Sequence, residues 1–185
     1  MYPEAFLERM KTLLGGEYDD FLKSTECAPS RALRINPFKL ADGSPTEGMK
    51  SALSLTPVPY AENGYFFDAE RIGATPWHHA GAFYVQDPGA MSAVAAVPIA
   101  KGAKILDLCA APGGKSHQAI SAAGREGLLV ANEYVSTRAK TMVGNFERLG
   151  IPNAMVTSLD TAVLPTLFDS YFDLVICDAP CSGEG

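Results

Sequence analysis

The sequence predicts an α/β protein in which a small α+β domain precedes an unfinished parallel sheet. From Asp87 onward, short apolar strands alternate with amphipathic helices, which is the pattern of a parallel sheet with helices on both faces. The segment before Asp87 mixes helices and short strands without that alternation. Only four strands of the alternating kind can be found, whereas doubly wound sheets usually contain more.

The first domain is predicted to cover residues 1–87. A helix is expected over 3–14, where apolar residues recur on one face and Gly15 suits the C-terminal cap. Ser44-Pro-Thr-Glu47 has the spacing of a capping box with proline at the first helical position, and predicts a helix that ends at Leu53. The remaining elements are a short helix at 18–23, a half-buried strand at 32–36, and strands at 65–67 and 82–85.

The second domain is predicted to cover residues 88–185. Asp87 followed by Pro88 marks the start of a helix that ends before Pro98. The expected strands are 104–109, 128–132, 154–157 and 172–177, and the helices between the first three are 115–123 and 135–149. The chain then ends on a loop, so we expect a fragment that is truncated after its fourth strand.

Composition excludes several classes of protein. Hydrophobic residues make up 47% and charged residues 19%, which fits a soluble protein with a real core. We expect no membrane association and no signal peptide, and we interpret the chain as cytoplasmic. The four cysteines form no C-x-x-C pair, which argues against a zinc ribbon or a disulfide scaffold. No metal site is expected, because the paired His78 and His79 lack a third ligand and His117 stands alone.

The charge leaves the type of substrate open. The net charge is -6 and the sequence pI is near 5.0, although a surface that binds nucleic acid normally shows an excess of basic residues. Either a basic face lies in sequence outside this chain, or the substrate is not a polyanion.

The turn after the first strand of the second domain is the main candidate for ligand binding. In open α/β sheets, ligands lie beyond the carboxyl ends of the strands, where the strand order reverses. Small residues in this turn let the backbone approach a ligand, and the next helix offers free N–H groups. The turn consists of Cys109, Ala110, Ala111, Pro112, Gly113, Gly114 and Lys115.

Carboxylates follow the next two strands. Glu133, some twenty residues after the glycine turn, can accept both hydroxyls of a ribose, although a solvated surface acid is an alternative. Asp160 can accept an amine of a nucleoside base or cap a turn. Asp107 is expected to be the most buried acid, bonded either to backbone or to an amino group of the ligand.

The fourth strand leads into Asp178-Ala-Pro-Cys181. A cysteine after an acid and a proline in a loop can act in catalysis if its pKa is tuned. Cys177, inside the strand, is expected to be a buried bystander, and Cys109 a small residue chosen for fit.

Two ligands can be weighed against this pattern. Gly114-Lys115-Ser116 after a strand is typical of a P-loop NTPase, but Cys109 stands where that motif needs glycine, and Pro112 lacks an N–H. S-adenosylmethionine uses every element: its ribose would meet Glu133, its adenine Asp160, and its methionine end the turn. The NTPase remains the alternative from a different functional class.

The motifs Asp107-Leu-Cys-Ala-Ala-Pro-Gly-Gly-Lys115 and Asp178-Ala-Pro-Cys-Ser-Gly183 resemble those of the Nop/Sun family of RNA cytosine-5 methyltransferases. Weaker similarity extends through Gln86-Asp87-Pro88 and Leu33-Arg34-Ile-Asn36. The resemblance implies an incomplete Rossmann-like, S-adenosylmethionine-dependent methyltransferase sheet. It also implies that residues 109–115, Glu133, Asp160 and Asp178 contact the methyl donor, and that the first domain helps to bind RNA.

The resemblance also implies a division of the chemistry. Cys181 matches the cysteine that assists product release, whereas the attacking thiol comes from a Thr-Cys motif on a fifth strand, beyond residue 185. The expected substrate is RNA, with ribosomal RNA preferred over transfer RNA, and no obligate protein partner is expected. A fragment without the attacking thiol should be inactive alone, and a catalytically dead RNA-binding module is a third alternative.

Overall fold

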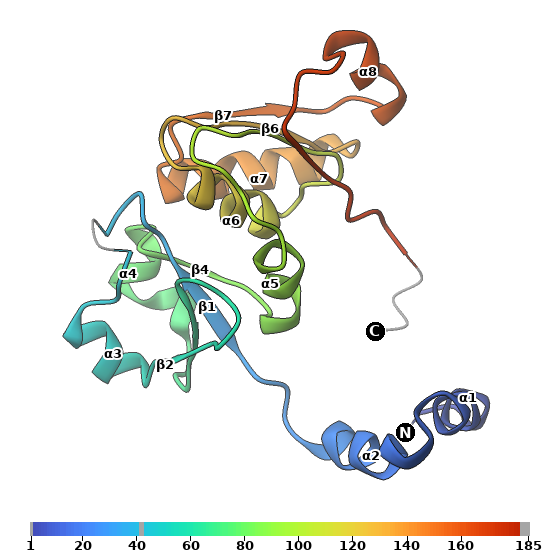
Figure 1. Ribbon diagram of the computed structural model, residues 1–185. Helices are drawn as coiled ribbons and strands as arrows, with labels where there is room; N and C mark the ends of the chain where they lie inside the picture. The colour runs from blue at the N-terminus through green and yellow to red at the C-terminus, as the bar shows by residue number, and fades with distance from the viewer. Residues whose placement is uncertain (1, 41–42, 182–185) are drawn as a thin grey trace. The chain divides into compact units, whose positions relative to one another are not determined.

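The computed structural model describes residues 2–40 and 43–181, and these fall into two compact units, Met1–Ser30 and Arg31–Gly185. The first unit contains α1 (Glu4–Leu14), a 3₁₀ turn (Gly15–Glu17) and α2 (Tyr18–Glu26), so both predicted helices are confirmed (Figure 1). Neither helix has a buried residue, because the two helices bury little apolar surface against each other. The packing includes Phe6 and Phe21, whose ring centroids are 6.4 Å apart.

The second unit begins with a four-stranded antiparallel sheet. Its strands are β1 (Ala32–Ile35), β2 (Thr56–Pro57), β3 (Gly64–Phe66) and β4 (Phe83–Val85), in the order β2-β3-β1-β4. The helical elements of this segment are α3 (Glu47–Leu53), a 3₁₀ turn (Ile72–Ala74) and α4 (Pro76–His79). β2 and α4 were not predicted, because two and four residues are too short for a periodic signal.

Two details of the first domain differ from the sequence prediction. The side chain of Thr46, not Ser44, caps α3 by accepting a hydrogen bond from Met49 N. β1 is buried along its whole length instead of on one face. The alternation failed as a guide because Arg34 and Asn36 turn inward toward polar partners instead of toward water.

The second sheet is parallel and carries the candidate site. Its strands are β5 (Lys104–Asp107), β6 (Leu128–Asn132), β7 (Ala154–Thr157) and β8 (Leu174–Ile176), in the order β7-β6-β5-β8. The chain therefore moves outward from β5 to β7 and then returns to the other side of β5. This reversal opens a crevice at the carboxyl ends of β5 and β8, where ligands of such sheets lie.

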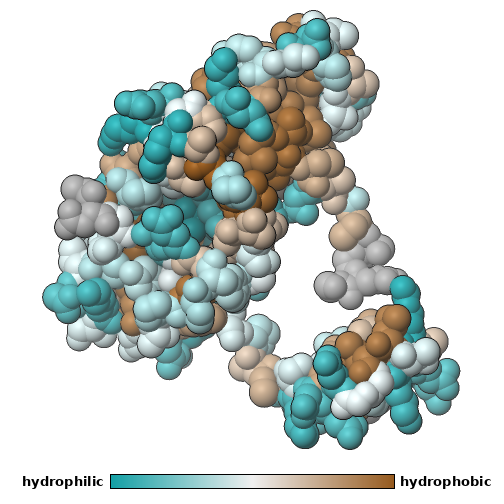
Figure 2. Space-filling model, in the orientation of Figure 1, coloured by the Kyte–Doolittle hydropathy of each residue, from teal (hydrophilic) through white to brown (hydrophobic). Residues whose placement is uncertain are grey.

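Helices cover the two faces of this sheet unequally. α5 (Pro88–Ala95), α6 (Gly114–Ala123) and α7 (Ser136–Leu149) contribute to one apolar core with β5 and β6. The opposite face is covered by α8 (Leu164–Leu167), which follows a 3₁₀ turn (Thr161–Val163) (Figure 1). Aromatic residues after α8 pack against the same face. Figure 2 shows apolar atoms near α8 and β8. The exposed apolar side chains of this region are Val163, Leu167, Tyr171 and Val175.

Cys177 is exposed, so the prediction of a buried bystander was wrong. Cys177 follows β8, which pairs with β5 and forms one edge of the parallel sheet in the described residues. Val175 in β8 is 52% exposed. The run of apolar residues predicted β8 correctly, but it could not show that few other residues pack on this strand. No helix in residues 2–40 and 43–181 is long and apolar enough to cross a membrane.

The antiparallel sheet is fastened to α7 at Gly81. The side chain of Asn36 donates hydrogen bonds to the carbonyls of Gly81 and Leu149, both at 2.7 Å. Arg148 donates to the carbonyl of His78 at 2.9 Å. The bond to Leu149 satisfies a carbonyl at the end of α7 that has no partner within the helix.

Candidate functional site

The turn from Cys109 to Lys115 leaves the end of β5 and enters α6. Gly113 lies at φ +107°, and a Cβ there would approach Phe146 to 2.8 Å. A Cβ on Gly114 would approach the ring of Tyr84 to 3.0 Å. Both glycines are therefore required by close packing, on α7 at one side and on β4 at the other.

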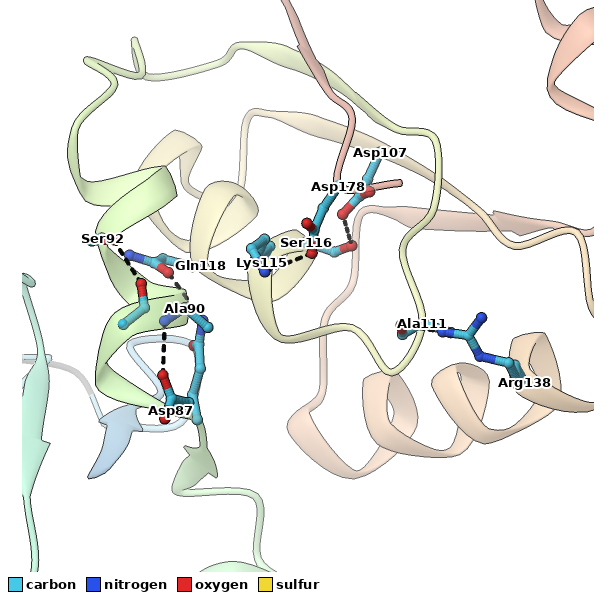
Figure 3. A network of polar contacts seen from close by, with 12 residues as sticks. Asp87, Ala90, Ser92, Asp107, Ala111, Lys115, Ser116, Gln118, Arg138 and Asp178 are labelled. Atoms are coloured by element: carbon cyan, nitrogen blue, oxygen red, sulfur yellow. Dashed lines mark hydrogen bonds and ion pairs between the residues drawn. The ribbon is translucent and has the colours of Figure 1, made fainter. Parts of the chain in front are cut away.

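Side chains from separate elements hold the carbonyls of this turn. Arg138 on α7 donates to Ala111 O at 3.0 Å (Figure 3). Asn145, also on α7, donates to Pro112 O at 3.0 Å, and Tyr84 donates to the same oxygen at 3.4 Å. The turn is therefore fixed by its surroundings before any ligand binds, which lowers the entropic cost of binding.

Glu133 lies at the end of β6 and is 3% exposed. Its Oε1 accepts a hydrogen bond from Val135 N at 2.9 Å. Its Oε2 is buried and lies 3.2 Å from Nη1 of Arg138, within ion-pair distance but without hydrogen-bond geometry. A buried carboxylate oxygen that lacks a hydrogen bond is costly, so Glu133 is poised to accept one from a ligand.

Glu133 and Asp160 line one cavity of about 370 Å³, called here the Glu133 cavity. Asp160 is exposed and accepts a hydrogen bond from Ala162 N at 2.9 Å, so it does cap the 3₁₀ turn that follows β7. The capping bond uses Oδ1. Both uses considered for Asp160, as a cap and as a ligand contact, are compatible with this position.

A second cavity of about 220 Å³, the Lys115 cavity, lies on the other side of the turn. Lys115 and Asp178 form an ion pair in its wall, with Nζ 2.7 Å from Oδ2 (Figure 3). Cys109 lines both cavities, so the two are adjacent. Their combined length follows the carboxyl ends of β8, β5 and β6, as an elongated nucleoside ligand would require.

Asp107 contributes a buried oxygen to the Lys115 cavity. It is 1% exposed, and its Oδ2 accepts a hydrogen bond from Ser116 Oγ at 2.6 Å (Figure 3). Its Oδ1 is buried without a hydrogen-bond partner in the described part of the chain. Burial raises the pKa of this carboxyl, and the bond from Ser116 opposes that rise. A donor such as an ammonium group would satisfy Oδ1.

The cysteines differ in their setting. Burial raises the pKa of the Cys109 thiol, so less of it is the reactive thiolate, in agreement with its interpretation as a small residue. Cys181 is exposed and follows Pro180, which lines the Glu133 cavity. Cys181 itself does not line either cavity.

Some site residues escaped sequence analysis. Arg138 was missed because the analysis of its helix followed only the apolar stripe; its position five residues after Glu133, in the first turn of α7, is the signal that could have found it. Tyr84 and Gln86 come from the first domain, and nothing in the sequence connects them to the turn. No three metal-ligating side chains gather anywhere in the residues that the structure describes.

His117 is part of the core, and its proton can be assigned. Arg34 can only donate, so Nδ1 of His117 accepts from Arg34 Nη2 at 2.7 Å and Nε2 donates to Asn36 Oδ1 at 3.3 Å. Burial lowers the pKa of His117 well below 6.5, and the charge of Arg34 lowers it further. The imidazole therefore stays neutral in the folded chain.

Acid should destabilise the chain through His117. Below pH 6.5 the unfolded chain binds a proton at His117 that the folded chain does not, so this group lowers stability by up to about 1.4 kcal/mol per pH unit as the pH falls. We expect His117→Gln, which cannot titrate, to lose less stability between pH 7.5 and pH 5 than the parent, in urea unfolding. The same replacement at the exposed His79 is the control, and an unchanged pH dependence in both variants would contradict the assignment.

Comparisons with known proteins identify the fold and the family of the chain. The strand order and helix arrangement define a Rossmann-like methyltransferase fold. This fold is shared with a methyltransferase homologue from Pyrococcus horikoshii, which is 25% identical, with a TM-score of 0.83 over 100% of this chain and 61% of that one. It is also shared with NSun6 from Pyrococcus horikoshii with SFG, with a TM-score of 0.79, 18% identity, and coverage of 97% of this chain and 71% of that one.

Two family models match nearly the whole sequence. Residues 2–88 match the N-terminal domain of 16S rRNA methyltransferase RsmF, and residues 94–185 match 16S rRNA methyltransferase RsmB/F. The chain belongs to the RsmB/F family of 16S rRNA methyltransferases. Ribosomal RNA small subunit methyltransferase F of Vibrio vulnificus is 36% identical over 99% of this chain, and that of Escherichia coli is 34% identical over 100%. The chain spans about two fifths of their length, 41% and 40% respectively.

Proposed function

We propose that the protein to which this chain belongs transfers a methyl group from S-adenosylmethionine to carbon 5 of cytosine in ribosomal RNA. The observation that carries this proposal is the row of carboxylates at successive strand ends, Asp178, Asp107 and Glu133, around a turn without a phosphate cradle. The donor has no phosphate but has an ammonium group and a ribose diol, which carboxylates can bind. Family membership supports RNA as the substrate.

The residues fit the donor in a definite orientation. The ribose hydroxyls would satisfy the unpartnered Oε2 of Glu133, and the adenine would lie toward Asp160. The methionine end would lie over residues 109–115, with its ammonium group near Oδ1 of Asp107. Among these groups, Asp107 and Glu133 each have a buried oxygen that lacks a hydrogen bond, which a bound donor would remedy.

The same residues make nucleoside triphosphate binding a weaker candidate. Pro112 has no N–H, and Gly113 N is already bonded to Ala110 O at 2.7 Å. Lys115 is paired with Asp178 and would have to break that pair to reach a phosphate. A phosphate cradle needs free N–H groups at these positions.

The chemistry of cytosine requires a covalent step. Carbon 5 becomes nucleophilic after a thiolate adds to carbon 6, and the resulting enamine attacks the sulfonium methyl group. S-adenosylhomocysteine leaves in this step. Asp178 would bond the ring nitrogen while the thiolate adds and stabilise the charge that develops there. A base removes the proton at carbon 5 and the thiolate leaves, with Cys181 assisting this release. We propose that the attacking thiol lies beyond residue 185.

RNA binding is assigned to residues 1–87 in this proposal, and the methyl-transfer chemistry to residues 88–185 and their continuation. A base within a helix would have to leave the stack to reach the Lys115 cavity, and a single-stranded loop would avoid that cost. The cytoplasmic location stays a prediction.

The test uses a protein that continues this chain to the length of its relatives. Incubation with small-subunit ribosomal RNA and a donor labelled in its methyl group, followed by digestion to nucleosides, should give label in 5-methylcytidine alone. The 185-residue chain should transfer none. Label in another nucleoside would refute the assignment of carbon 5, and the absence of transfer by the longer protein would favour an RNA-binding module. Transfer by the short chain that survives Cys181→Ala would refute the position of the attacking thiol.

A further inference from the structure

Arg34 is a buried cation without a carboxylate partner. It lies in β1, is 1% exposed, and forms no ion pair with any acid in residues 2–40 and 43–181. Its bonds go to neutral acceptors: His117 Nδ1 at 2.7 Å, Gln86 Oε1 at 3.3 Å and Gly114 O at 3.4 Å. Burial lowers the pKa of Arg34 to about 9, so the side chain still carries its charge at neutral pH.

Two of these acceptors belong to the first turn of α6, directly after the turn that holds the donor in the proposed function. Gly114 is the first residue of α6 and His117 lies three residues further along. Lys115, between them, points toward Asp178 in the Lys115 cavity (Figure 3). Arg34 therefore binds the backbone carbonyl of Gly114 before Lys115 and the side chain of His117 after it.

The third acceptor, Gln86, is fixed in one orientation. Because its Oε1 accepts from Arg34, its Nε2 must donate, and it does so to Gln118 Oε1 at 3.3 Å. Gln118 in turn donates to Met91 O at 2.9 Å. This chain of hydrogen bonds fastens β4, α5 and α6 together behind the Lys115 cavity, which Gln86 also lines.

Stability alone does not account for this arrangement. A cation near a helix N-terminus is unfavourable, because the unpaired N–H groups there carry partial positive charge. A buried charge is also more costly than an apolar side chain of similar volume. A charge that is buried despite both costs is expected to serve a function.

We propose that Arg34 is a positioning residue of the methyl-donor site. Its guanidinium group, held in the antiparallel sheet, fixes the start of α6 and thereby sets where Lys115 and the Gly113–Gly114 backbone meet the amino-acid end of the donor. The first domain is then a structural part of the donor site as well as a candidate for RNA binding. The identity of the ligand in this inference rests on the proposed function. The effect of Arg34 on the conformation of the turn does not depend on it.

The first measurement needs no ligand. Arg34→Lys keeps the positive charge but loses the planar set of N–H donors of the guanidinium. Arg34→Met keeps a similar side-chain length but neither the charge nor the donors. In both, hydrogen exchange at the amides of 113–118 should rise at least about tenfold relative to the parent, whereas exchange in β6 stays unchanged. Arg31→Met is the matched control, because the exposed Arg31, just before β1, contacts Asp68 at 3.4 Å and lies 5.1 Å from the ring centroid of Phe67, both far along the chain from the turn. Equal exchange at 113–118 in Arg34→Lys and the parent would overturn the proposal.

The second measurement separates positioning from general stability. S-adenosylhomocysteine has the amino-acid end of the donor, whereas methylthioadenosine lacks it. Calorimetry should show at least about tenfold weaker binding of S-adenosylhomocysteine by Arg34→Lys, with methylthioadenosine bound as in the parent. Equal weakening of both ligands would indicate a merely structural role and overturn the proposal. If the parent binds neither ligand, the proposed function fails for this chain, and the hydrogen-exchange result alone decides the role of Arg34.

Discussion

Gly81→Ala should destabilise the chain by more than about 3 kcal/mol, the largest effect expected for adding one methyl group. Gly81 lies at φ +72°, and a Cβ there would lie 2.0 Å from the carbonyl oxygen of Arg148. Backbone cannot move aside as a flexible side chain can. The new methyl group would therefore push β4 away from the end of α7 and break the bonds of Asn36 to Gly81 O and Leu149 O. Urea unfolding measures the change.

Gly102→Ala is the matched control for that prediction. Gly102 has nearly the same φ, +79°, but a methyl group added there would meet no atom within 4 Å outside its chain neighbours. Only the cost of a left-handed conformation remains, about 1–2 kcal/mol. If the two variants lose similar stability, conformational strain rather than the close contact with α7 explains the effect at Gly81.

The alternating strands and long helices of the second domain could be predicted from sequence, but α8 (Leu164–Leu167) was missed because four residues carry no periodic signal. The first domain could be predicted only in outline. The strands at 128–132 and 154–157 have the predicted bounds, because short apolar strands separated by amphipathic helices admit few other interpretations. In the first domain the long helices were predicted, but β1 was expected to expose one face to solvent, whereas it is buried along its whole length. Burial of Arg34 depends on acceptors from residues 86, 114 and 117, and no local pattern reveals partners so distant in sequence.

The candidate site shows the same division. Position at a strand end was enough to select Glu133 and Asp178 from the sequence, and both line a cavity next to the glycine turn. The residues that orient the site were invisible, because Arg138, Tyr84 and Asn145 act on backbone carbonyls. A hydrogen bond to a carbonyl imposes no motif on the residue that accepts it. Sequence therefore revealed groups that would touch a ligand better than groups that hold the turn.

Glu133→Gln should weaken binding of S-adenosylmethionine by about 10- to 100-fold, with a smaller loss of stability in the free chain. A hydrogen bond to a charged group contributes about 1.5–3 kcal/mol, and the ribose would lose at least one such bond. Without ligand, the amide keeps an oxygen that accepts from Val135 N, but it loses the ion pair between Oε2 and Arg138, which are 3.2 Å apart, so the free chain loses some stability. Calorimetry with the donor and thermal unfolding of the free chain measure the two effects.

The two measurements separate the roles of Glu133, since a residue that only supports the fold should lose stability without a matching loss of affinity in the folded chain. Glu126→Gln is the control, because Glu126 is exposed and lines neither cavity, and it should change neither value. Titration with ATP tests the rival ligand in the same variants. Tighter binding of ATP than of S-adenosylmethionine by the parent, or donor binding that is indifferent to Glu133, would mean that the carboxylates at these strand ends do not surround a ribose.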